Sequence, residues 1–241
     1  MKKIAVFLST LFFSMLLFAK PVNFFTPKIP EIEIQPSLNV NILPDSKDSE
    51  LGISTIARFD MKELVWDAGI NYVNNQFDFT TQVIYWPTFF EKINFGVGFT
   101  YHFYNYPDSF VEHDIFADVY LRWRFTKYFE LYTRYGFMGK YTVIPVIKDA
   151  IPVLKNETMN FDLIFTCYPA EKWNFYTQFS SATYFDYPVF MSIFLNNGVE
   201  TIIYRDEVTI GVDLITKWYD GVVVSLNAGQ IGINFYGKIK L

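Results

Sequence analysis

Charged side chains recur at even-numbered positions in residues 114–141, and they are the first candidates for chemistry. Acidic and basic groups both occur among them, and apolar or aromatic residues fill most positions in between. Such a pattern can line a water-filled passage, or it can stiffen a protein interior through ion pairs. The sequence leaves both interpretations open. The candidate pore-lining residues, including later members of the pattern, are Asp114, Asp118, Arg122, Arg124, Glu130, Arg134, Lys140, Asp162, Glu200 and Asp213.

A second chemical candidate is a short polar segment that contains one of the two histidines. His113 is close in sequence to Asp108, Ser109 and Asp114, which together supply the groups of a hydrolytic Ser-His-Asp set. The same residues are also the normal solvated content of a loop, and a triad is recognised by geometry rather than spacing. His113, Ser109 and Asp114 are therefore alternative catalytic candidates. The sequence has no metal-ligand cluster, phosphate loop or nucleotide motif, so we expect no metal and no cofactor.

The alternation predicts that long β-strands position these side chains, because successive residues of a strand point to opposite faces. Two strands of about 12 residues flank the turn at 126–129, whereas soluble strands usually have about 5 or 6. One face is apolar and aromatic, and the other carries charges of both signs. In-register pairing predicts four facing pairs: Arg124 with Glu130, Asp114 with Lys140, Arg122 with Tyr132, and Arg134 with Tyr120.

The rest of the chain repeats this hairpin pattern. We expect twelve strands, with ten as the alternative because the first two are the weakest. In the last strand, the alternation of apolar residues shifts by one position near Gly229, which predicts a β-bulge there. The expected strands are 32–42, 53–59, 64–72, 77–85, 93–103, 114–125, 131–141, 159–167, 175–185, 191–203, 208–214 and 222–241.

Composition indicates where such a sheet resides. Aromatic residues make up 20% of the chain, which is very high for a soluble domain. Beyond the N-terminus no apolar run reaches the 18 or so residues that mark a helical span, so the strands must cross a membrane as a closed barrel. The net charge of −5 argues against nucleic acid as a partner. The single Cys167 cannot form an internal disulfide.

The N-terminus predicts export. Lys2 and Lys3 precede an apolar run from Ile4 to Phe18, and Ala19 provides a small residue for cleavage. This is the layout of a secretory signal peptide. We expect residues 1–19 to be the signal peptide and residues 20–241 the mature barrel.

Three short turns, at 86–92, 125–129 and 168–173, each hold a Lys and are flanked by aromatic residues. Short turns belong on the periplasmic side of an outer-membrane barrel, and aromatic rings suit the headgroup level. We therefore expect the Trp, Tyr and Phe residues of these turns, Trp86 and Tyr168 among them, to form an aromatic girdle at this end. We expect the aromatics of the opposite loops to form a second girdle.

Alternating apolar residues continue to the last position, through Ile231, Ile233, Phe235, Ile239 and Leu241. Here the chain resembles bacterial outer-membrane β-barrel proteins, whose final strand is read by the barrel-assembly machinery, although those proteins usually end in Phe. The resemblance implies an all-β, transmembrane, antiparallel up-and-down β-barrel in the bacterial outer membrane. It also implies membrane lipid and the assembly machinery as partners, and leaves the oligomeric state open.

The sequence favours a small passive, porin-like channel or a structural membrane protein. The acidic excess predicts that an open pore prefers cations weakly. The alternatives are an outer-membrane rim enzyme, either a lipid-modifying hydrolase or a protease, and an exported soluble β-sandwich. The apolar segment Ile144 to Lys155 either continues its hairpin, folds inward as a constriction, or forms an adhesive patch.

Overall fold

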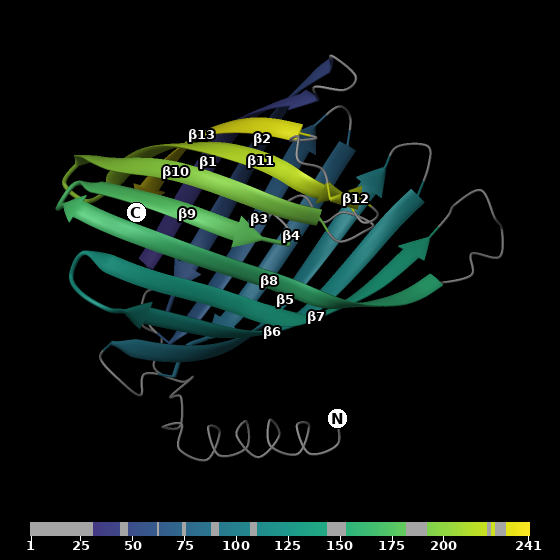
Figure 1. Ribbon diagram of the computed structural model, residues 1–241, viewed down its shortest axis with the longest axis horizontal. Helices are drawn as coiled ribbons and strands as arrows, with labels where there is room; N and C mark the ends of the chain where they lie inside the picture. Colours follow the sequence, from purple (N-terminus) through teal and green to yellow (C-terminus); the bar gives the residue numbers. More distant parts are fainter. Residues whose placement is uncertain are drawn as a thin grey trace.

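One antiparallel sheet closes on itself to form a barrel (Figure 1). The computed structural model describes residues 31–43, 48–61, 63–73, 76–87, 92–106, 110–143, 153–181, 192–220, 223–224 and 230–241. The predicted signal peptide lies outside these residues. The strands are β1 (Glu31–Leu43), β2 (Asp48–Asp60), β3 (Leu64–Val73), β4 (Gln76–Tyr85), β5 (Ile93–Tyr106), β6 (Phe110–Arg124), β7 (Phe129–Val143), β8 (Val153–Ala170), β9 (Trp173–Ser180), β10 (Ser192–Tyr204), β11 (Val208–Asp220), β12 (Val223–Val224) and β13 (Gln230–Lys240).

Each long strand pairs with its neighbours in sequence, and β1 pairs with β13 to close the ring. Because β12 has two residues and pairs only with the end of β11, twelve strands form the wall. The expected up-and-down barrel is confirmed with twelve strands rather than ten. The soluble β-sandwich is wrong, because a sandwich needs two stacked sheets and this chain forms one closed sheet.

The central hairpin has the predicted register. All four facing pairs occur between β6 and β7, from Arg124 opposite Glu130 to Asp114 opposite Lys140. The turn closes with Phe125 donating its backbone N–H to the Phe129 carbonyl at 3.1 Å. The hairpin therefore fixes which side chains of β6 and β7 share the inner face.

Two boundaries differ from the prediction or extend it. The final barrel strand is Gln230–Lys240 and not the whole of 222–241, because Val223 and Val224 fold back against Asp220 and Tyr219 of β11. The predicted bulge at Gly229 lies outside the described residues. Most of the segment from Ile144 to Lys155 lies outside them too, but Val153–Lys155 belong to β8 and pair with β7, which agrees with a continued hairpin.

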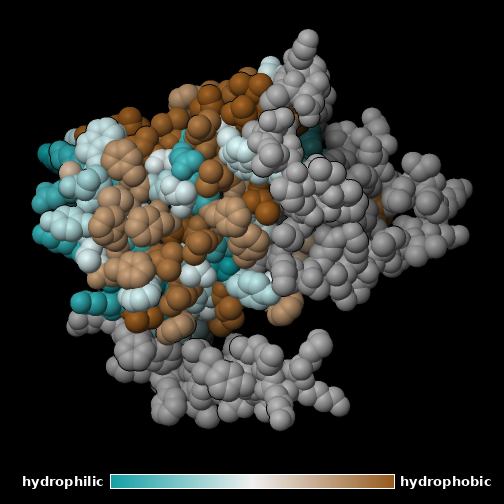
Figure 2. Space-filling model, in the orientation of Figure 1, coloured by the Kyte–Doolittle hydropathy of each residue, from teal (hydrophilic) through white to brown (hydrophobic). Residues whose placement is uncertain are grey.

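The outer surface is a broad hydrophobic belt. Leu51 is 62% exposed and Phe137 64% exposed, although large apolar side chains are normally buried in a soluble protein. Figure 2 shows the apolar side chains spread over the barrel wall, with hydrophilic groups gathered at the end that carries the C-terminus. A barrel with this surface is suited to a lipid bilayer. Within the described part of the chain, no helix has the length and hydropathy to cross a membrane.

Aromatic rings surround both ends of this belt. The prediction is wrong for Trp86 and Tyr168, which line the interior cavity. Strand parity explains this: Trp86 lies two residues beyond the inward Ile84, and Tyr168 two beyond the inward Thr166. Exposed aromatics include Trp66, Trp123, Phe129 and Trp173 towards the short-turn end, and Tyr72, Phe137, Tyr141 and Trp218 towards the other end.

Candidate functional site: the barrel lumen

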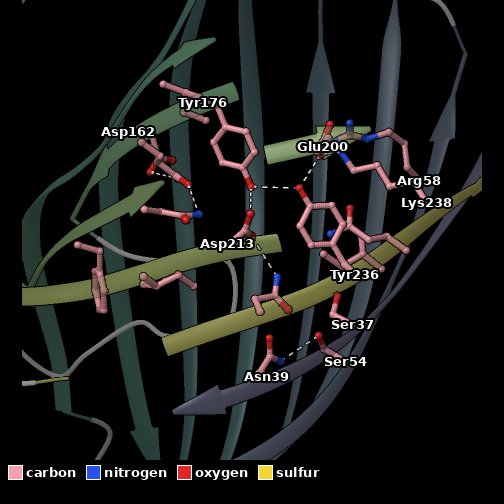
Figure 3. A pocket seen from close by; sticks show the side chains of 18 of the residues that line it. Ser37, Asn39, Ser54, Arg58, Asp162, Tyr176, Glu200, Asp213, Tyr236 and Lys238 are labelled. Atoms are coloured by element: carbon pink, nitrogen blue, oxygen red, sulfur yellow. Dashed lines mark hydrogen bonds and ion pairs between the residues drawn. The ribbon is translucent and has the colours of Figure 1, made fainter. Parts of the chain in front are cut away.

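The barrel encloses a cavity of about 950 Å³ whose lining is mainly polar. Figure 3 shows that side chains from well-separated parts of the sequence converge on it. They arrive from the inner face of each long strand, because every second residue of a barrel strand points inward. The site is therefore a product of strand parity and register rather than of a local motif.

A buried ion-pair cluster centres on Arg134 of β7. Its guanidinium Nε lies 2.5 Å from an Asp162 carboxylate oxygen on β8, and its Nη1 lies 4.0 Å from Asp118 on β6. The Arg134 side chain is only 6% exposed. Asp162 also accepts hydrogen bonds from the Ser180 hydroxyl and, at 3.2 Å, from Gln178. One cation thus holds three neighbouring strands together.

A second cluster surrounds Glu200 of β10 (Figure 3). Its carboxylate binds the Lys238 ammonium and accepts hydrogen bonds from the Tyr236 hydroxyl at 2.7 Å and from Asn174 at 2.8 Å. Three further side chains, Tyr176, Asp213 and Asn234, extend this network. The Tyr176 hydroxyl donates to Asp213 and lies 3.2 Å from the Tyr236 hydroxyl, and Asn234 donates to Asp213 at 3.2 Å.

Inward glycines allow these long contacts. Gly198 leaves the space that the Tyr176 ring occupies, and Gly211 leaves the space for the Tyr236 ring. Each ring crosses over the glycine strand and reaches a carboxylate one strand further away. A Cβ at Gly198 would stand 2.2 Å from the Tyr176 ring, so the arrangement requires glycine there.

Two more ion-pair groups lie towards the short turns. Arg58 of β2 binds both oxygens of Asp67 on β3, at 2.8 and 2.9 Å. Arg122 binds both oxygens of Glu130, at 2.8 and 3.1 Å, and Arg124 contacts the same carboxylate at 3.3 Å. Bidentate Arg–carboxylate pairs fix orientation as well as charge. The three arginine side chains are about half exposed, and their carboxylate partners fix the positions of the cations.

The pore-lining residues predicted from the sequence lie at different places in the structure. Asp114 and Asp118 are buried on the inner face, Arg124 contacts Glu130, and Lys140 lies opposite Asp114 in the register. Arg134 faces Tyr120 in the register as predicted, but its ion pairs are with Asp162 and Asp118. The candidates that line the cavity are Arg122, Glu130, Arg134, Asp162, Glu200 and Asp213.

Sequence reasoning missed several cavity residues. Ser37 and Asn39 occupy the positions between the apolar residues of β1, so parity alone could have identified them. Tyr236 and Lys238 lie on the face opposite the alternating apolar residues from Ile231 to Leu241, so the same parity indicates them. Nothing in the sequence marks Arg58 as the partner of Asp67, because that pairing depends on the β2–β3 register.

The histidine candidates do not assemble into a catalytic set among the described residues. His113 lies on the outer face against Phe103 and Tyr141, with its Nδ1 2.7 Å from the Tyr101 hydroxyl. Asp114, its neighbour on β6, points inward and is fully buried. Ser109 lies outside the described residues. Among the residues that are described, no group of three or more His, Cys, Asp or Glu is placed to hold a metal ion.

The arrangement of strands and lining can be compared with solved structures. The NanC porin matches with a TM-score of 0.64 at 13% sequence identity, covering 87% of this chain and 100% of that one. The KdgM porin in complex with disordered oligogalacturonate matches with a TM-score of 0.61 at 8% identity, covering 87% and 99%.

The chain has the fold of small outer-membrane porins. No protein-family model and no curated protein matches the sequence. At these identities the likeness concerns the fold alone. The resemblance to bacterial outer-membrane β-barrels inferred from the strand pattern is thereby confirmed at the level of the class.

Proposed function

We propose that this protein is a passive, porin-like channel of the bacterial outer membrane that admits small hydrophilic solutes. The observation that carries the proposal is the polar-lined cavity of about 950 Å³ inside a closed barrel with an apolar outer belt. Water and small solutes can occupy a polar lumen, whereas an apolar interior would exclude them. The fold shared with the KdgM and NanC porins supports the same function.

The charge of the lining supports a weak preference for cations. Among the described residues, more acidic than basic groups line the cavity, so the potential that they create inside is negative on balance. The oligogalacturonate named with the KdgM structure is an anion, and this lining does not favour such a solute. The acidic members are Glu33, Glu50, Asp60, Asp78, Glu130, Asp162, Glu200 and Asp213, and the basic members are Arg58, Arg122, Arg134, Lys217 and Lys238.

Export and assembly follow from the two ends of the chain. Residues 1–19 act as a signal peptide, and the mature barrel comprises residues 20–241. The barrel-assembly machinery recognises the alternating apolar residues of β13, which ends beside the exposed Leu241. These steps place the barrel in contact with outer-membrane lipid.

Conductance in planar lipid bilayers tests the channel function. We expect discrete openings from folded protein. In a KCl gradient, the reversal potential should have the sign of a K⁺-selective pore, with a smaller magnitude than the value for a pore that passes only K⁺. Folding is checked by heat-modifiable gel mobility. Folded protein that never conducts would mean a structural role, in which the ion pairs only fill the lumen, and an anion-favouring potential would contradict the charge argument.

A further inference from the structure

Three aromatic rings form a cluster on one side of the lumen, on the inner face of the barrel wall. Trp86 extends beyond the end of β4 and lies over Gly96 of β5. Its ring centroid is 5.7 Å from that of Tyr120 and 6.2 Å from that of Tyr132, and the two tyrosines are 6.0 Å apart. Trp86 and Tyr132 line the cavity, whereas Tyr120 is buried behind them. We call this cluster the aromatic wall.

The facing side of the barrel presents short uncharged polar side chains. Ser37 and Asn39 of β1, Ser54 of β2 and Asn234 of β13 line the same cavity. The Asn39 amide donates to the Ser54 hydroxyl at 3.3 Å (Figure 3). We call these four residues the amide wall. In the strand order of the ring, β7 is separated from β1 by the same number of strands in either direction, so Tyr132 lies across the lumen from β1. Trp86 follows β4 and extends over β5 towards Tyr132, so it borders the space between Tyr132 and the amide wall from the β4 side.

Four of the five basic residues that line the cavity, Arg122 among them, are already paired with carboxylates. Arg134 is paired with Asp162, Arg58 with Asp67, and Lys238 with Glu200. An anionic solute would have to break these pairs and would also meet the acidic excess of the lining. An uncharged solute avoids both costs. Amides and hydroxyls can each donate and accept hydrogen bonds, which matches the hydroxyl groups of a sugar.

An aromatic face opposite hydrogen-bonding amides is a suitable site for a ring-shaped solute with an apolar face and a polar edge. The electron-rich ring face attracts the weakly positive C–H groups of a sugar ring, and a few placed polar groups fix its orientation. We propose that the lumen binds neutral, hydroxyl-rich solutes, namely short uncharged oligosaccharides, between the aromatic wall and the amide wall. This inference rests on the proposed channel function.

The test measures current block through single channels by maltotriose and maltohexaose, with trigalacturonate as the acidic comparator. We expect the neutral sugars to interrupt the current reversibly and trigalacturonate to do so much more weakly. Trp86→Ala should weaken block by about tenfold, the effect of one lost aromatic contact, while KCl still passes. Trp86→Phe should restore most of the block.

Matched variants separate binding from general damage. Trp123→Ala removes an indole that is 39% exposed on the outer surface, so we expect normal block by sugars. Asn39→Leu probes the amide wall if Trp86→Ala fails to fold, and it should weaken block. Equal block by wild type and both wall variants, or stronger block by trigalacturonate, would overturn the inference.

The experiments distinguish a failure of the proposed sugar-binding site, the subsite between the two walls, from a failure of the proposed channel function. A conducting channel that no neutral sugar blocks would overturn the subsite and leave the channel function intact. A folded barrel that never conducts would contradict the channel, and calorimetric titration of the detergent-folded protein with maltohexaose would then decide the subsite. No heat of binding in that titration would overturn it as well.

Discussion

Replacing Arg134 by methionine should destabilise the barrel strongly. The substitution keeps most of the side-chain volume but removes the charge that lies 2.5 Å from Asp162 and 4.0 Å from Asp118. Asp162 is 8% exposed and Asp118 4% exposed, so two carboxylates from the strands on either side of β7 would remain buried without their cation. Removing one partner of a buried ion pair typically costs about 3–5 kcal/mol. We expect a loss in this range in the free energy of unfolding.

Urea titration of protein folded in phospholipid vesicles measures this loss. Arg124→Met is the matched control, because the Arg124 side chain is 53% exposed and its contact with Glu130 should contribute at most about 1 kcal/mol. Adding Asp162→Asn to Arg134→Met should recover part of the stability, since the asparagine oxygen can still accept from Ser180. A loss below about 1 kcal/mol for Arg134→Met would mean that water screens the cluster, and would refute the buried ion pair.

Three further predictions concern glycine, charge and export. Gly98→Ala places a Cβ 2.8 Å from the Tyr120 ring and should lower the free energy of unfolding in urea by about 1–3 kcal/mol. Gly237→Ala, whose Cβ would have its nearest contact at 3.8 Å, should lower it less. Equal losses for the two variants would contradict the close packing at Gly98. Glu200→Gln leaves Lys238 without its carboxylate and should shift the reversal potential towards anions, and an unchanged potential would place this cluster outside the ion path. Intact-mass measurement of the exported protein should give a chain beginning at Lys20, and a retained Met1 would exclude cleavage after Ala19.

Strand parity made much of the fold predictable. The turn at 126–129 is short, so its register follows directly, and the four predicted β6–β7 pairs are all present. Parity also separates the outward Ile115 from the inward Asp114. The prediction failed for Trp86 and Tyr168 because their place in a turn was given more weight than their parity with the preceding strand.

The connections across the lumen could not be predicted, because they depend on which strands become neighbours and on space rather than charge. Glu200 and Lys238 belong to strands separated by β11, and they meet where Tyr236 crosses over Gly211. A glycine in a strand sequence does not indicate which ring will cover it. Likewise, Arg134 faces Tyr120 in the hairpin register, but its ion pair with Asp162 lies on the other side, with β8.

Adjacent residues of β1 offer the most direct test of the polar, solute-accessible lumen. Ser37 lines the cavity, and Leu38 is 42% exposed on the outer belt. In a Cys167→Ser background, Ser37→Cys and Leu38→Cys are each treated with a bulky, charged, water-soluble thiol reagent during conductance recording. Modification at position 37 should reduce the current sharply, and the same treatment at position 38 should leave it unchanged. Equal currents before and after treatment at position 37, despite labelling shown by mass, would contradict a conducting path along this lumen.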